Sequence, residues 1–237
     1  MADGLGDGCV AVRLDRALEM RRVDQPAVDD GFARALAATR REMAGSEVMF
    51  DGVIAIPVAV RGHVVDSYEA TYAWHLTERG GTPLPAGRGM VAMALILERP
   101  DGSVLWQRRA ARLVFGGTWD VSAAGSWHPG EDPVEAAYRE GSEELGVPRD
   151  RLGQPRDVWM VVGPPPRGVT VLVRSPVPPE LVPRPNPAEV DEVRWARTPD
   201  ELPGDVWNVR RRMLTEIGFP WDPERASGSP PRASDRR

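Results

Sequence analysis

The segment of residues 125–147 constrains the fold of this chain most strongly, because it predicts a loop and a helix in a fixed order after a strand. Residues 119–123 have the composition of a short strand, and Gly125 and a Pro-Gly loop follow them. The run Glu131, Asp132, Pro133 is typical of the start of a helix. We therefore expect a helix over residues 133–145, directly after this strand and loop.

Three glutamates of this predicted helix, Glu140, Glu143 and Glu144, lie at positions i, i+3 and i+4 and so project from one side of it. Like charges at this spacing raise each other's proton affinity unless a cation intervenes. Carboxylate oxygens select a hard divalent ion such as Mg²⁺, which usually shares its coordination with substrate phosphates. A solvated acidic helix face is the alternative explanation, but the strand and loop before the helix favour a metal and phosphate site.

The spacing matches the Nudix box, written G-x5-E-x7-R-E-U-x-E-E-x-G-U with U a bulky aliphatic residue. The residues on pattern are Gly125, Glu131, Arg139, Glu140, Glu143, Glu144, Gly146 and Val147. The chain resembles the Nudix hydrolase family in this box, and a looser likeness runs from about residue 91 to about residue 202. Many fixed polar and glycine positions at fixed spacing make the motif a specific one.

One position departs from the box, since Gly141 stands where the family has a bulky aliphatic residue. Glycine in a helix interior costs about 1 kcal/mol relative to alanine. Gly141 also belongs to an apolar stripe with Val134, Ala137 and Leu145, beside the acidic face. We expect the missing side chain to let the helix lie closer to the sheet, while the carboxylate spacing stays intact.

The resemblance implies an α/β fold, namely a Nudix-type α/β/α sandwich with a mixed sheet, to which this chain adds an N-terminal β-rich extension. It also implies a metal site in which Glu140, Glu143 and Glu144 supply carboxylates and Gly125 supplies a backbone carbonyl. Mg²⁺ is the expected ion, and Mn²⁺ is a second candidate. Glu143 and Glu144 are catalytic candidates as well, because the division of roles differs between family members.

The resemblance further implies that Arg139 orients these carboxylates by an ion pair, which a guanidinium can do in a fixed bidentate geometry. Glu135 and Glu143 both lie one helical turn away and are expected partners. Glu131 is expected to support the loop or to bind a further ion.

The expected reaction is a substitution at phosphorus, in which metals polarise a diphosphate and an activated water attacks one phosphorus atom. Helix glutamates that bind metal are not free to take the proton of the water, so a second acidic cluster is expected nearby. Residues 186–192 contain such a cluster, and Glu189 is its catalytic candidate. A solvent-facing acidic loop remains the alternative for this segment.

Other residues near the box are candidates for contact with substrate. They are Arg108, Arg109, Trp127 and His128. The arginines are candidates for phosphate contact, although surface exposure is the commoner fate of arginine. Trp119 is expected in the core, and His63 and His75 are expected to be structural because no partner pattern surrounds them.

Residues 1–85 are predicted to form an N-terminal extension of one helix and several strands. The first twenty residues are expected to be loosely ordered, and Asp24 is expected to cap a helix from Pro26 to Gly45. Three strands are expected at 48–60, 63–68 and 70–76. The extension is weakly similar to the added sheet of nucleotide-sugar pyrophosphatases, which implies a role in the substrate pocket and a homodimer. A sheet that only covers apolar surface is the alternative.

Residues 86–223 are predicted to form the Nudix domain, after a Gly- and Pro-rich linker at 80–89. Strands are expected at 91–98, 119–123, 157–162, 169–173 and 189–196, with a further strand that ends at Arg109. Asp205 is expected to cap a last helix that ends at Gly218 and Pro220. Residues 224–237 are expected to be a disordered tail, because they are rich in Ser, Pro and Arg.

Composition places the chain among ordinary globular proteins, with 41% hydrophobic residues in 237. No apolar run approaches the roughly 20 residues of a membrane span, and the N-terminus has no export signal, so we expect no membrane contact and a cytoplasmic location. Cys9 is the only cysteine, which excludes an intrachain disulfide. A net charge of −5 argues against general nucleic-acid binding.

The hydrolysis of a nucleoside diphosphate linked to a sugar or similar group, with release of a phosphate monoester, is the leading functional prediction. Residues 119–132 also resemble isopentenyl diphosphate isomerases, but those enzymes have a catalytic cysteine just before the box, and Cys9 lies far upstream. A third possibility is a Nudix domain that binds its ligand without turnover. The identity of the small-molecule diphosphate is left open, because pocket residues come from variable loops and the extension.

Overall fold

A mixed eight-stranded sheet forms the centre of the computed structural model, which describes residues 9–45, 51–79, 89–113, 115–128, 130–163 and 168–219. The strand order is β1-β9-β10-β5-β6-β11, with β7 paired to β6 and β8 paired to β5. The strands are β1 (Val10–Arg13), β5 (Val91–Glu98), β6 (Val104–Arg109), β7 (Trp119–Val121), β8 (Ala123–Ser126), β9 (Asp157–Val162), β10 (Val169–Pro176) and β11 (Val190–Ala196). Strand β10 runs parallel to β5, while β5 also pairs antiparallel with β6 and β8, so the sheet is mixed as predicted.

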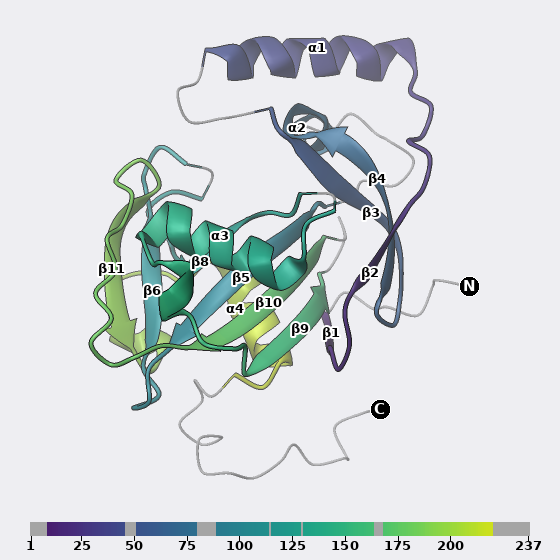
Figure 1. Ribbon diagram of the computed structural model, residues 1–237. Helices are drawn as coiled ribbons and strands as arrows, with labels where there is room; N and C mark the ends of the chain where they lie inside the picture. The colour runs from purple at the N-terminus through teal and green to yellow at the C-terminus, as the bar shows by residue number, and fades with distance from the viewer. Residues whose placement is uncertain are drawn as a thin grey trace.

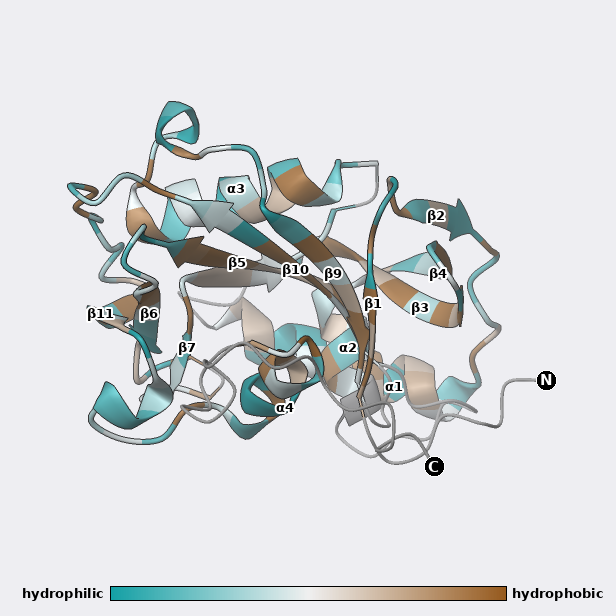
Figure 2. Ribbon diagram, turned by 90° about the horizontal axis from the view of Figure 1, so that it is seen from below, coloured by the Kyte–Doolittle hydropathy of each residue, from teal (hydrophilic) through white to brown (hydrophobic). Residues whose placement is uncertain are grey.

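Helices cover both faces of this sheet, with α3 (Pro133–Leu145) on one face and α4 (Asn208–Glu216) on the other (Figure 1, Figure 2). Side chains alternate along the buried strand β5, because successive residues of a strand point to opposite faces. Met93 and Leu95 pack in the core beneath α3, and Ala94 and Ile96 pack in the core beneath α4. The predicted α/β/α sandwich is confirmed.

A second sheet of order β2-β4-β3 lies beside the first and packs against α2, on which α1 packs in turn (Figure 1). Its elements are β2 (Glu19–Arg22), α1 (Asp30–Ala44), β3 (Val53–Arg61), β4 (Val64–Thr71) and α2 (Tyr72–Arg79). Phe32 of α1, Tyr68 of β4 and Trp74 of α2 meet in its core, with the Phe32 and Trp74 ring centroids 4.6 Å apart. We call these five elements the N-terminal unit, and they are the β-rich extension expected from the sequence. None of the described helices has the length and apolar character needed to cross a bilayer.

The prediction that the first twenty residues are loosely ordered is wrong for β1 and for the start of β2. Strand β1 pairs antiparallel with β9 at the edge of the main sheet, and β2 pairs parallel with β4. Both pairings join segments far apart in the chain, so local periodicity carries no trace of them. Residues 1–8, the linker at 80–88 and the tail from residue 220 lie outside the described residues.

The strand predicted over residues 70–76 is also wrong, because β4 ends at Thr71 and α2 begins at Tyr72. The Asp51 carboxylate accepts a hydrogen bond of 2.7 Å from the backbone N–H of Ala73 and so supports the first turn of α2. A distant side chain thus decides the conformation of a segment whose own sequence suits either state.

Two predicted helix starts differ from the structure, although the helices themselves are present. Asp29, and not Asp24, caps α1 by accepting from the N–H of Phe32 at 2.7 Å. Asp205 does not cap α4, because α4 begins at Asn208 and its N-cap residue is Trp207, whose side chain makes no capping hydrogen bond. The box helix α3 has the predicted bounds, and Asp132 caps it by accepting from the N–H groups of Val134 and Glu135.

Candidate active site

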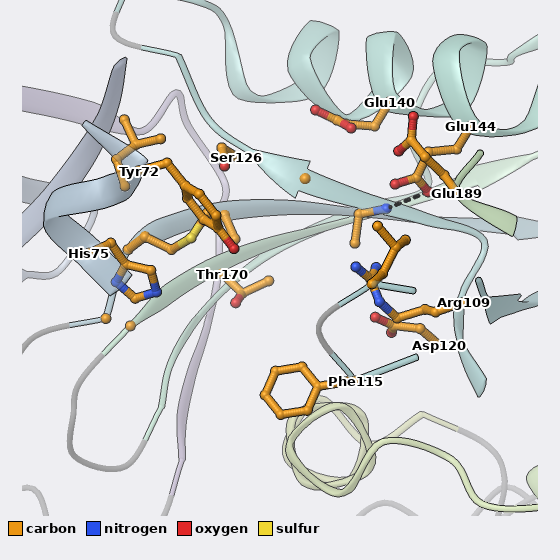
Figure 3. Close-up of a pocket in the computed structure, with 18 of the residues that line it drawn as sticks. Tyr72, His75, Arg109, Phe115, Asp120, Ser126, Glu140, Glu144, Thr170 and Glu189 are labelled. Carbon is orange, nitrogen blue, oxygen red and sulfur yellow. Dashed lines mark hydrogen bonds between the residues drawn. The ribbon is translucent and has the colours of Figure 1, made fainter. Parts of the chain in front are cut away.

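A cavity of about 720 Å³ lies where α3, β8 and the loop before β11 meet α4 and the N-terminal unit. Its lining includes Glu140 and Glu144 of α3, Gly125 of β8, and Glu189 of the loop. Figure 3 shows Glu140, Glu144 and Glu189 in the same corner of this cavity, with the Glu140 carboxylate pointing away from the other two, although Glu189 comes from a different part of the chain. The predicted acidic helix face therefore meets a cavity rather than bulk solvent.

Glu140 and Glu144 are both buried, with 7% and 3% of their surface exposed. Glu144 is held by donors from two strands, because its Oε2 accepts from Nε2 of Gln107 at 2.7 Å and from the N–H of Ala124 at 3.2 Å. Glu143, between them in sequence, lies at the rim with its side chain 54% exposed. The spacing i, i+4 thus selects the two buried carboxylates, and the i+3 position remains accessible from solvent.

The loop that carries Glu189 is anchored to the end of α3. The N–H of Asn186 donates to the Glu144 carbonyl at 2.7 Å, and the N–H of Arg184 donates to the Leu145 carbonyl at 2.6 Å. These carbonyls belong to the last turn of a helix, which lacks intrahelical partners. Gly146 closes the helix at φ 60°, where a Cβ would lie 2.9 Å from the Arg184 carbonyl oxygen. The box glycine therefore permits the docking that brings Glu189 near Glu144.

Arg112 strengthens the placement of the Glu189 loop. Its guanidinium donates to the carbonyls of Ala188 and Pro187 at 3.0 and 2.9 Å. The N–H of Ala110 donates to the Glu189 carbonyl at 2.9 Å, and Asn186 Nδ2 donates to the Glu189 carboxylate at 3.2 Å. Both the backbone and the side chain of Glu189 are thus held in place.

Arg139 connects the box residues by hydrogen bonds to several carboxylates. It donates to Glu131 at 2.9 and 3.3 Å, to Glu140 at 2.8 Å and to Glu143 at 3.0 Å. The expected partner Glu135 pairs with Arg149 instead, at 2.8 Å. Burial alone would lower the pKa of Arg139, but the hydrogen bond to Glu131 and the nearby carboxylates raise it above its ordinary value.

Burial changes the acidity of both carboxylates. Desolvation raises the pKa of Glu140 to about 7, with Arg139 acting in the opposite direction and Glu143 adding to the rise. Desolvation raises the pKa of Glu144 to about 8, and the charge of Glu140 adds to it while Gln107 and Arg109 lower it. A positive ion between these groups would stabilise both carboxylates in their charged form and so oppose both shifts.

We expect the metal-free protein to lose stability as the pH rises from about 5 to about 9. Glu140 and Glu144 bind protons more tightly in the folded state than in the unfolded state, so their contribution is complete below the unfolded pKa and is lost as the pH passes the folded pKa. At about 1.4 kcal/mol for each pKa unit, the two raised pKa values correspond to a loss on the order of several kcal/mol. Urea unfolding in the presence of a chelator at several pH values measures it.

Added Mg²⁺ tests whether Glu140 and Glu144 cause this pH dependence. Added Mg²⁺ should stabilise the protein more at pH 9 than at pH 6, since protons no longer compete for the carboxylates. Glu135, whose pKa is lowered by the hydrogen bond from Arg149, titrates below this range and does not contribute. A metal-free stability that rises between pH 6 and pH 9 would contradict the expected burial of the two carboxylates.

Gly125 allows the closest contact in the site. A Cβ built on Gly125 would lie 2.2 to 2.3 Å from the carboxylate atoms of Glu140. Gly125 has no positive φ, so its role is this close approach rather than an unusual backbone conformation. Gly141 has a similar role on the other side of α3, where a Cβ would lie 2.6 Å from Cδ2 of Leu95. This contact agrees with the expectation that glycine brings the helix close to the sheet.

The Gly125→Ala variant should bind Mg²⁺ at least about tenfold more weakly, because the new methyl group displaces the Glu140 carboxylate. Calorimetric titration with a nucleoside diphosphate present measures the loss, and thermal unfolding should change little. Gly45→Ala is the matched control, since a Cβ there meets its nearest heavy atom only at 3.7 Å. Unchanged affinity in Gly125→Ala would separate Glu140 from metal binding.

The donor chemistry of this corner fits a hard divalent ion, although the ligands are not already gathered around one point. Within the described ranges, no three carboxylate, imidazole or thiol side chains stand close enough together to ligate an ion as placed. Arg139 and Gln107 instead hold one oxygen each of Glu140 and Glu144. A bound ion would coordinate these oxygens in place of Arg139 and Gln107. Its positive charge would stabilise the two buried carboxylates in their ionised form.

Two of the four predicted substrate contacts line the cavity, and two do not. Arg109 and His128 line the cavity. Trp127 packs in the core with 3% of its surface exposed and donates from Nε1 to the Glu131 carbonyl, so it does not face the cavity. Arg108 is not among the lining residues and pairs with Glu192 at 3.4 Å on the neighbouring strand. Trp119 is a core residue, as expected.

Several lining residues were not predicted. Asp120 and Arg210 form a buried ion pair, with Nε of Arg210 donating to Oδ1 of Asp120 at 2.6 Å. His75 also lines the cavity. Gln107 takes part in the site as the hydrogen-bond partner of Glu144. Asp120 lies between two apolar residues in strand β7. A carboxylate in such a strand is the one local indication that a buried cation pairs with it.

Comparison with known proteins connects this geometry to a family. The NUDIX domain family matches residues 88–217. A curated relative, an uncharacterized Nudix hydrolase (orf19) of Rhodococcus erythropolis, is 42% identical over 55 residues, which span 22% of this chain and 30% of that protein.

Among the solved structures similar to this chain are two Nudix hydrolases. One is a Nudix hydrolase from M. Smegmatis, RenU, with 24% identity and a TM-score of 0.44, covering 60% of this chain and 88% of that chain. The other is a MutT NUDIX hydrolase from Burkholderia pseudomallei, with 25% identity and a TM-score of 0.41, covering 54% of this chain and 96% of that chain.

Proposed function

The chain belongs to the NUDIX family, and from this membership we propose that it is a pyrophosphohydrolase that cleaves the diphosphate linkage of nucleoside diphosphate-linked compounds. Nucleotide sugars and similar compounds are the proposed substrates. The observation that carries the proposal is that the buried carboxylates Glu140 and Glu144 line the same corner of the cavity as Glu189. A cavity of this volume is of the size that holds a nucleotide-like ligand.

We propose that Glu140 and Glu144 hold the divalent ion, with the Gly125 carbonyl and the rim carboxylate Glu143 as further ligands. Mg²⁺, or Mn²⁺ in its place, would polarise the diphosphate and neutralise charge that develops on its oxygens. Arg139 supports this assignment, because its hydrogen bonds hold Glu131, Glu140 and Glu143 in one arrangement.

Glu189 is the proposed general base that takes a proton from the attacking water. It lines the cavity together with the helix carboxylates but belongs to a separate loop. The helix carboxylates would bind the ion, and Glu189 would remain available for the proton. Its backbone and carboxylate are each held by hydrogen bonds, which suits a group that must meet a water molecule in a defined position. Arg109 and His128 are the proposed contacts for the phosphate groups.

A substrate panel tests the proposed function. The protein is incubated with Mg²⁺ and, in turn, nucleotide sugars, ADP-ribose, nucleoside triphosphates and prenyl diphosphates. We expect nucleoside monophosphate to be released from nucleotide sugars or ADP-ribose, and release to stop when a chelator is added. Turnover of nucleoside triphosphates alone would overturn the proposed substrate class.

The other two functions considered from the sequence are separate outcomes of the same panel. Isomerisation of an allylic diphosphate would identify an isomerase, but the only cysteine of the sequence, Cys9, packs in the core beneath α4 and does not line the cavity. Tight binding of a nucleotide sugar without product would identify a ligand-binding protein. Either result would contradict hydrolysis.

A further inference from the structure

The N-terminal unit forms one wall of the cavity, and this wall lies outside the residues matched by the NUDIX family. Its described contributions to the lining are Gly52, Val53, Ile54, Tyr72 and His75. None of these five residues carries a carboxylate or guanidinium group. The charged lining residues, from Arg109 to Arg210, all lie within the matched range of 88–217. The cavity therefore has a charged part within the matched range and, outside it, a wall without carboxylate or guanidinium groups.

The two parts face each other across the cavity. Figure 3 shows Tyr72 and His75 on one side, and Glu140, Glu144, Glu189, Arg109 and Asp120 on the other. The Tyr72 hydroxyl points toward Thr170, and Ser126 lies near the opposite end of the Tyr72 side chain. A diphosphate bound beside the carboxylates would therefore extend its attached group toward Tyr72.

Tyr72 is held firmly in this position. It is the first residue of α2, and its N–H donates to the Gly52 carbonyl at 3.0 Å. The Asp51 carboxylate holds the next residue through the N–H of Ala73. Trp74 packs on the opposite side of α2 against Phe32 of α1. These contacts place Tyr72 and His75, three residues apart, together on the side of the helix that faces the cavity.

The chemistry of this wall suits a flat, uncharged ring. The Tyr72 and His75 rings lie 5.9 Å apart at 41°, with Tyr72 half-buried and His75 buried behind it at 5% exposed. Aromatic rings favour stacking with planar π systems, and hydroxyl groups nearby can pair with the polar edge of such a ring. A phosphate would find no guanidinium on this wall, and a prenyl chain would leave the hydroxyl groups without partners.

We propose that Tyr72 and His75 form the subsite for the nucleobase of the substrate, so that the N-terminal unit determines which diphosphates the NUDIX domain accepts. This inference rests on the proposed function, since it places the diphosphate beside Glu140 and Glu144. Tyr72 acts by stacking on the base, and α2 acts by holding Tyr72 across the cavity from the carboxylates.

Equilibrium binding of two probes to the full chain with Mg²⁺ tests the subsite without turnover. The probes are ADP, which carries a base, and inorganic pyrophosphate, which does not. Tyr72→Leu should weaken ADP binding about tenfold, which corresponds to about 1.4 kcal/mol of stacking, and should leave pyrophosphate binding unchanged. Tyr72→Phe keeps the ring and should retain most of the ADP affinity.

Val58→Ala is the control variant, because Val58 is exposed on β3 and is not among the lining residues. Thermal unfolding of each variant identifies a loss of fold. Equal weakening of ADP and pyrophosphate in a folded Tyr72→Leu protein, or no weakening of either, would overturn the subsite. Phe115, an exposed ring elsewhere in the lining, provides a competing location, and loss of ADP binding in Phe115→Leu alone would also overturn it.

The inference and the proposed function fail in different ways. A wild-type protein that releases nucleoside monophosphate, with a Tyr72→Leu variant of equal ADP affinity, would reject the subsite and keep the hydrolase. A wild-type protein that binds neither probe and hydrolyses nothing in the panel would reject both.

Discussion

Replacement of Glu144 by glutamine should lower Mg²⁺-dependent release of nucleoside monophosphate about a thousandfold, the scale on which an electrostatic group at the reaction centre acts. Glutamine keeps the size of the side chain, and its Oε1 can still accept from Gln107 and from the N–H of Ala124. What it loses is the negative charge that would bind the ion. Initial rates with the best substrate of the panel measure the effect.

The fold of Glu144→Gln should be retained, and its stability at pH 8 should equal or exceed that of the wild type. The reason is that a buried carboxylate costs desolvation free energy in the folded protein, and glutamine removes that cost. Glu192→Gln is the matched control, since Glu192 pairs with Arg108 and Arg194 and does not line the cavity. Comparable turnover by folded Glu144→Gln and wild type would remove Glu144 from the mechanism.

Replacement of Asp120 by asparagine should cost about 3 to 5 kcal/mol of unfolding free energy, because it leaves the charge of Arg210 buried without a counter-ion. The Arg210 and Asp120 side chains are only 3% and 1% exposed, so solvent cannot take over the role of the carboxylate. In a chain of this size such a loss lowers the melting temperature by about 10 °C. Urea unfolding at neutral pH gives the free energy directly.

Two variants test the cause of this loss. Glu135→Gln breaks an ion pair of similar geometry between half-exposed side chains and should cost less than about 1 kcal/mol. Asp120→Leu combined with Arg210→Met removes both charges and should recover most of the stability lost in Asp120→Asn. A cost for Asp120→Asn as small as that for Glu135→Gln would mean that the buried pair does not anchor α4 to β7.

The helix that carries the site could be predicted from local sequence, because each of its determinants lies within a few residues of the feature it controls. Asp132 and Pro133 start α3, and Gly146 ends it, as the structure confirms. The i, i+4 spacing of Glu140 and Glu144 places both carboxylates on one side of any regular helix. These features depend on backbone geometry alone and hold wherever the helix packs.

Predictions from local sequence are wrong where a residue distant in the chain determines the secondary structure or the helix start. Residues 70–76 suit a strand or a helix, and the Asp51 carboxylate selects the helix. Asp24, Asp29 and Asp30 are all acceptable caps, and packing of Phe32 against Trp74 accompanies the choice of Asp29. Strand β1 forms because β9 has a free edge.

The local sequence specifies the box, namely the bounds of α3, the spacing of its carboxylates and the glycines that permit close approach. Packing between distant segments places Gln107 against Glu144, Arg210 against Asp120, Trp127 in the core, and Tyr72 and His75 opposite the carboxylates. The reason is physical. Helix periodicity and capping act over one or two turns, whereas a cavity wall is assembled from segments whose separation in sequence leaves no local pattern.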